Sequence, residues 1–116
     1  MILSDIKAAL ETVDPRVYYG AAGTLEDGDL WDYIVFSRSG LSTTGNDTGV
    51  ANGYQVAIVR ENFIPEETVE AVIKAMREIA GMRPAGNEFP YYYETKPKTN
   101  TVLEMLVLDF VKPRKR

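Results

Sequence analysis

A single apolar stripe in the segment 65–80, PEETVEAVIKAMREIA, restricts the fold more than any other feature of the sequence. Its apolar side chains recur at helical spacing: Val69, Val72, Ile73, Met76, Ile79 and Ala80. One face of an α-helix has this spacing, and a helix with such a face is stable only when that face is packed. Pro65 suits the first turn, and Gly81 and Pro84 end the segment. The sequence therefore predicts a helix here that lies on an apolar partner.

The segments around this helix predict strands, because they are rich in β-branched and aromatic residues and are separated by turn-forming residues. They are 17–22, 31–37, 54–61, 89–96 and 101–112. The first dozen residues carry a second helical stripe, which Asp14 and Pro15 end. We expect an α+β fold with a largely antiparallel sheet of about five strands and two helices packed on one face. The expected order is helix-strand-strand-strand-helix-strand-strand, in one domain over residues 1–116.

Cysteine and histidine are both absent from the 116 residues. Their absence excludes disulfides, thiolate zinc sites, cysteine nucleophiles and every catalytic triad that needs imidazole. We expect no enzyme activity and no cofactor. The net charge of −4 argues against a surface that mainly binds nucleic acid. No run of about 18 apolar residues and no signal-peptide pattern is present, so we expect a cytoplasmic product with no membrane partner.

The segment SRSGLSTTGNDTGVANGY lies between two predicted strands, where loops of this length are uncommon. Four glycines and few apolar residues predict a long loop at about 38–53 that is mobile until a partner orders it. Gly40 and Gly45 are spaced as in a phosphate-binding loop, but Asn46 and Asp47 replace the required Lys and Ser/Thr. The candidate partner contacts are Leu41, Ser42, Thr43, Thr44, Asn46, Asp47 and Thr48.

Charge is distributed unevenly along the chain. An acidic turn contains Glu26, Asp27, Asp29 and Asp32, and a basic tail occupies residues 112–116. The acidic turn is either solvated or a site for calcium or magnesium, although its spacing departs from an EF-hand loop. The basic tail is either solvated or contacts phosphates or a neighbour's acidic turn. Three consecutive tyrosines at 91–93 place aromatic rings on both faces of one strand, for core packing or for an interface.

Five segments, in this order, carry a resemblance that covers essentially the whole chain. They are the short opening helix, WDYIVFSRSG, YQVAIVRE, PEETVEAVIKAMREIAGM and TVLEMLVLDFVKP. Together they resemble the tail terminator, or tail-completion, family of long-tailed bacteriophages. The resemblance is one of element order and composition and includes no catalytic motif.

The resemblance implies a structural virion protein at the tail-head junction, made in the bacterial host cytoplasm. It implies a homo-oligomeric ring, expected to be hexameric, that ends the tail tube and joins it to the head connector or a head-completion protein. DNA would only pass through the lumen of such a ring. In this setting the candidate inter-subunit residues are Asp27, Asp29, Asp32, Tyr91, Tyr93, Lys112, Arg114, Lys115 and Arg116. Two alternatives stay open: another neck protein, either head-completion or connector-adapter, and a carboxylate-based metal-binding domain or enzyme.

Overall fold

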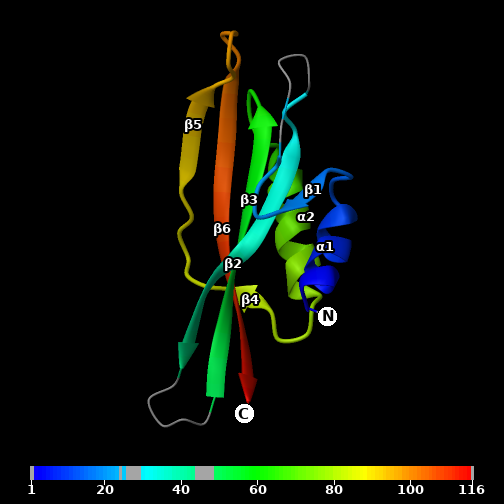
Figure 1. Cartoon of the computed structure of the whole chain (residues 1–116), viewed down its shortest axis with the longest axis vertical. Helices are drawn as coiled ribbons and strands as arrows, with labels where there is room; N and C mark the ends of the chain where they lie inside the picture. Colours follow the sequence, from blue (N-terminus) through cyan, green and yellow to red (C-terminus); the bar gives the residue numbers. More distant parts are fainter. Residues whose placement is uncertain (1, 24, 26–29, 44–48, 116) are drawn as a thin grey trace.

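The computed structural model describes residues 2–23, 25, 30–43 and 49–115 (Figure 1). Within these ranges lie two helices, α1 (Ile2–Glu11) and α2 (Glu66–Arg77). The strands are β1 (Val17–Tyr19), β2 (Tyr33–Thr43), β3 (Gly49–Glu61), β4 (Arg83–Pro84), β5 (Tyr91–Thr95) and β6 (Val102–Lys115). The predicted α+β class is confirmed, and the predicted order is roughly that of the structure. Within the described ranges, neither helix has the length and apolar character needed to cross a membrane.

The strands form one six-stranded mixed sheet in the order β1-β2-β3-β6, with β4 and β5 both pairing with β6. All pairings are antiparallel except that of β1 with β2, which is parallel. Segment 20–32 separates those two strands, and a crossover of about this length is what a parallel pair needs. The two-residue strand β4 was not predicted, because Arg83 and Pro84 have no strand-forming pattern of their own.

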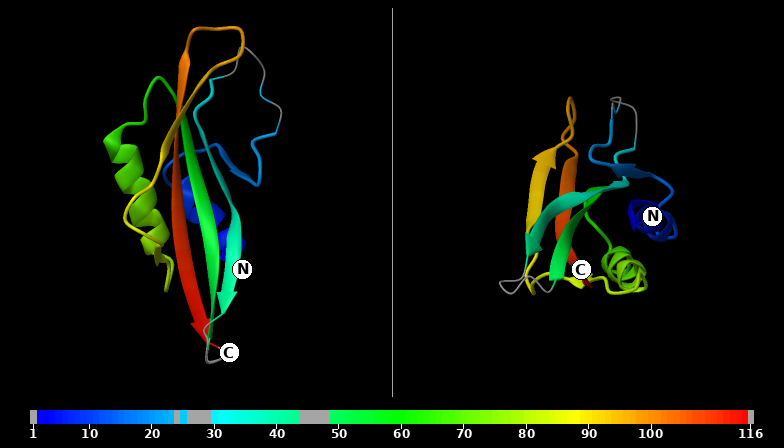
Figure 2. Two further views of the ribbon diagram at one scale, coloured as in Figure 1. Left: turned by 90° about the vertical axis from the view of Figure 1, so that its left-hand side faces the viewer. Right: turned by 60° about the horizontal axis from the view of Figure 1, so that its bottom comes forward.

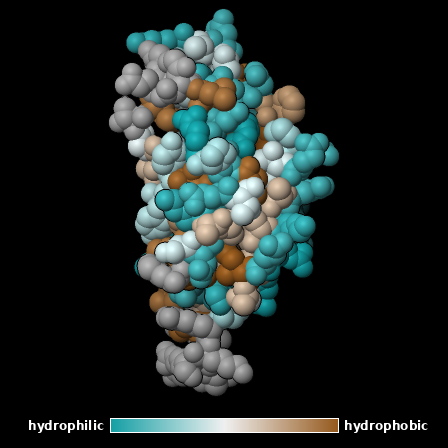
Figure 3. All heavy atoms as spheres, turned by 90° about the vertical axis from the view of Figure 1, so that its right-hand side faces the viewer, coloured by the Kyte–Doolittle hydropathy of each residue, from teal (hydrophilic) through white to brown (hydrophobic). Residues whose placement is uncertain are grey.

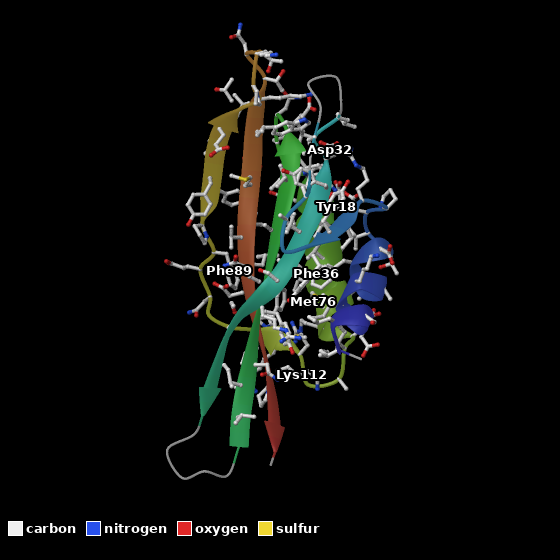
Figure 4. The ribbon with its side chains drawn as sticks, viewed as in Figure 1. Tyr18, Asp32, Phe36, Met76, Phe89 and Lys112 are labelled. Atoms are coloured by element: carbon white, nitrogen blue, oxygen red, sulfur yellow. The ribbon has the colours of Figure 1, made fainter. Side chains whose placement is uncertain are left out.

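Both helices pack on one face of the sheet, where they lie next to each other (Figure 2). The fully buried core joins Ile6 and Leu10 of α1, Val72 and Met76 of α2, and Ile34, Phe36, Val56, Ile58, Leu108 and Phe110 of the sheet. Burying one such side chain contributes about 1.5–3 kcal/mol. Phe36 and Met76 point into this layer (Figure 4). Val69, Val72, Ile73 and Met76 of the stripe predicted for the second helix thus form the face that packs on the sheet, whereas Ile79 and Ala80 lie beyond the end of the helix at Arg77.

Beyond the helices, three strands continue as a projecting arm, so that the molecule measures 52 × 26 × 24 Å (Figure 1). We define the arm as Ser37–Thr43 of β2, Gly49–Gln55 of β3 and Val111–Lys115 of β6. The prediction of a loop over 38–53 was therefore wrong for residues 38–43 and 49–53, which are strand. The basic tail is likewise strand as far as Lys115. In the arm, β6 pairs with β3 and so forms the third strand. This pairing stabilises strand structure in segments that have low strand propensity of their own.

Candidate assembly surface

The root of the arm contains a β-bulge at Ser39. Strand β2 pairs Arg38 with Tyr54 and then Gly40 with Gly53, which leaves Ser39 as the extra residue. A Cβ atom on Gly53 would lie 2.5 Å from the Ser39 Oγ. Glycine at position 53 therefore lets the two strands pass the bulge and continue their pairing to Thr43. The bulge re-aims the arm relative to the body of the sheet.

A groove of about 580 Å³ lies at this root, between the arm and the start of α1. Its lining residues are Ile2, Arg38, Ser39, Gly40, Leu41, Asn52, Gly53 and Tyr54. Leu41 is 63% exposed, although it is a large apolar residue within the paired part of β2. Among the described lining residues Arg38 is the charged one, and Ile2, Leu41 and Tyr54 supply apolar surface. Such a lining suits contact with a polypeptide better than acid–base chemistry.

The arm carries only positive formal charge in its described part. Its charged residues are Arg38, Lys112, Arg114 and Lys115. Lys112 lies beside the segment that follows α2, with its Nζ 3.4 Å from the position a Cβ on Gly81 would take (Figure 4). The predicted basic cluster is thus brought into the same arm as Leu41, Ser42 and Thr43. Thr44, Asn46, Asp47, Thr48 and Arg116 lie outside the described residues.

Strand β5 lies toward the other end of the molecule (Figure 1), and all five of its residues are exposed. Tyr91, Tyr92 and Tyr93 are 49%, 51% and 61% exposed. Phe63, in the loop after β3, is 66% exposed. The helix side of the molecule, by contrast, is mainly hydrophilic (Figure 3). Exposed aromatic side chains of this kind are enriched where proteins bind one another.

A hydrogen bond orients one of these tyrosines. The Tyr93 hydroxyl donates to Oε2 of Glu104 at 2.8 Å, and the Ile64 N–H donates to Oε1 of the same carboxylate at 2.7 Å. The bond to Glu104 raises the pKa of the Tyr93 phenol above its ordinary value, with smaller contributions from burial and nearby charge. The hydrogen bond therefore holds the Tyr93 ring beside Glu104 of the neighbouring strand β6.

Of the acidic turn, the structure describes Asp32, and its side chain forms a hydrogen bond within the fold. Its Oδ1 accepts a hydrogen bond from the Glu61 N–H at 3.0 Å. Glu61 in turn accepts from Trp31 N–H at 2.7 Å and forms an ion pair with Lys96 at 2.9 Å. The hydrogen bond from Lys96 lowers the pKa of Glu61, and that from Trp31 lowers it further. These contacts fix the entry to β2 against the end of β3.

Glu26, Asp27 and Asp29 lie outside the described residues, so the carboxylate site predicted on the acidic turn stays a prediction. In the part of the chain that the structure describes, no group of three or more acidic side chains is placed to hold a metal ion. No protein-family model matches the chain, and no curated protein matches its sequence.

Sequence reasoning missed the contribution of Phe63 and Arg38 to these surfaces. Phe63 follows Asn62, a non-glycine residue with a positive φ of 74°, which turns the chain after β3. That turn, and not any apolar periodicity, places the ring outside the core. For Arg38 the relevant fact is that β1 ends its pairing at Phe36, which leaves the next residues of β2 at the edge of the sheet. Neither fact has a pattern in the sequence that could have indicated it.

Proposed function

We propose that this chain is a structural protein of a bacteriophage neck, which forms a ring on the end of the tail tube, ends tail assembly and joins the tail to the head. The observation that carries the proposal is the projecting, basic, three-stranded arm. It extends past the helix-covered core and presents Leu41 and the root groove to a partner. The order of elements that resembles the tail terminator family supports the same function.

The buried polar groups of the described residues support a structural role as well. Among the described residues, the buried charged ones are Asp14 and Lys96. Asp14 forms an ion pair with Arg60, and Lys96 forms one with Glu61. Ion pairs of this kind hold segments together and leave no group poised for proton transfer. The arm, with Leu41, and strand β5, with its tyrosines, both expose apolar side chains that a partner could cover.

Binding to the tail-tube protein of the same genome tests the proposal. Purified chain is mixed with assembled tubes and sedimented, and we expect it to pellet with them at a few copies per tube, because only tube ends offer the site. The matched control replaces Leu41–Asn52 by an Asn-Gly turn, which keeps the body and removes the outer arm. We expect this variant to stay in the supernatant.

Absence of the parent chain from the tube pellet contradicts the proposal. Binding along the whole tube contradicts it too, because a terminator occupies ends. If the chain binds the head connector but not the tube, it belongs to another position in the neck.

A further inference from the structure

We infer that copies of this chain associate edge to edge, with strand β5 of one copy pairing with the arm portion of β2 in the next. The inference rests on the proposed function, which requires copies to assemble, and it names the two surfaces that meet. It starts from the two long edges of the sheet that the described strands leave open. One is the outer edge of β5, and the other is the outer edge of β2 from Ser37 to Thr43.

The hydrogen-bond pattern shows which groups of β5 are available. Val107 N–H donates to Pro90 O at 3.2 Å, and Lys96 N–H donates to Thr101 O at 2.8 Å. Facing pairs in an antiparallel ladder alternate between bonded and non-bonded, so Tyr92 and Glu94 direct their main-chain groups toward β6. Tyr91, Tyr93 and Thr95 consequently direct theirs outward. This row of donors and acceptors can bind one more strand.

The arm edge of β2 offers a matching row. Strand β1 covers β2 only from Ile34 to Phe36. Beyond the bulge, Leu41 pairs with Asn52, which pairs in turn with Lys112 on β6. The alternation along β6 directs the main-chain groups of Lys112 toward Asn52, so those of Leu41 point away from β3. The bulge at Ser39 interrupts this alternation, so the regular stretch runs from Gly40 to Thr43 and can pair with up to four of the five residues of β5.

Proline distinguishes this edge from the opposite edge of the arm. On β6, Val107 and Asp109 direct their main-chain groups away from β3, toward Pro90 and Ala85. By the same alternation Pro113 lies at an outward position, where its missing N–H prevents a further strand from pairing. Natural sheets often protect exposed edges in this way. No proline occurs between Ser37 and Thr43, so the arm is protected on one side and open on the other.

Charge favours a second copy as the occupant. The described arm carries four basic residues and no acidic one. Strand β5 contains Glu94 and no basic residue, and Glu104 faces it across the ladder. Lys96 and Lys98 follow the strand, and Lys96 forms an ion pair with Glu61. Complementary potentials of this kind select the partner and its orientation. Leu41 on one edge and the exposed tyrosines on the other add apolar surface that pairing would bury.

Proline substitutions at outward positions test the inference with little effect on the fold. Tyr93→Pro removes one outward N–H of β5, and Leu41→Pro removes one on the arm. The controls are Tyr93→Phe, which loses the bond to Glu104 but keeps the N–H, and Leu41→Ala. We expect each proline variant to associate roughly tenfold more weakly than its control in sedimentation, the equivalent of one or two net hydrogen bonds. Circular dichroism should show the same helix content in all four.

A mixture of the two proline variants gives the decisive result. Each variant keeps the edge that the other lacks, so an equimolar mixture should form one-to-one pairs that are about tenfold tighter than the self-association of either variant alone. Proline variants that associate as well as their controls overturn the inference, and so does a mixture that fails to pair. The proposed function survives either of these outcomes if the parent still binds tube ends, and it fails separately if the parent pairs as inferred but ignores the tube.

Discussion

Asp14 and Arg60 form a buried ion pair, with 2.7 Å between Oδ2 and Nη2, that joins the segment after α1 to β3. Their side chains are only 7% and 12% exposed. Asp14 also accepts a hydrogen bond from the Arg16 N–H at 2.9 Å, and Arg60 donates to the Val59 carbonyl at 2.9 Å. The first helix is thus fastened to the sheet by polar contacts as well as by Ile6 and Leu10.

Removing one partner of this pair should be costly, because it leaves the other charge buried without compensation. We expect Asp14→Asn to lower the free energy of unfolding by about 3–5 kcal/mol. Urea denaturation measures it, with Asp5→Asn on the exposed face of α1 as the control. A loss in Asp14→Asn no larger than in the control would show that the pair does not stabilise the fold.

Stability should depend on pH through Glu61. Its folded pKa is lowered from the ordinary value of 4.5 by Lys96 and Trp31, so the charged form is favoured in the folded state. The corresponding stabilisation is present above pH 4.5 and is lost as the pH falls through the lowered folded pKa. Melting temperatures measured across this acid range check the dependence. Glu61→Gln should flatten the curve there, and an unchanged slope in this variant would rule the assignment out.

Local pattern was enough to predict the core. Ile34 and Phe36 alternate with half-buried neighbours in a segment predicted to be strand, and Val72 and Met76 of the predicted stripe lie on the face of α2 that packs on the sheet. The period of the apolar residues decides which side of an element is buried, and the period is visible in the sequence.

The arm could not be predicted in the same way. Segments such as SGLST and GVANG have low strand propensity, and they become strand because β6 continues beside them to Lys115. The pairs Asp14–Arg60 and Glu61–Lys96 likewise join residues far apart in the chain. The proposed assembly surface consists of strand edges that stay unpaired. Which edges stay unpaired follows from the topology of the whole sheet, including the parallel pairing of β1 with β2.

The outer arm should be dispensable for folding. Replacing Leu41–Asn52 by Asn-Gly joins Gly40 to Gly53, which already face each other, through a turn suited to antiparallel strands. The replaced segment contributes no side chain to the buried core among its described residues. We expect the parent's helix content and a single cooperative unfolding transition. Loss of that transition would mean that the arm is needed for the core.

Association should weaken as salt is added. At an ionic strength of about 1 M the Debye length is roughly 3 Å, which screens attraction between the basic arm and the carboxylates on and beside β5, Glu94 and Glu104. We expect sedimentation at low and high salt to show the larger assembly at low salt. Arg38→Gln should reduce this difference, since Arg38 lies on the pairing strand itself. Assembly that is equally strong at both ionic strengths would argue against charge complementarity.

The mass and shape of the assembled chain test the central claim most directly. The measurement combines light scattering with electron microscopy of the purified chain, alone and with tail tubes. The account predicts closed rings of one defined copy number, in solution or seated on tube ends, and their loss in the variant without the outer arm. A chain that stays monomeric at every concentration, and that leaves tube ends bare, would contradict it.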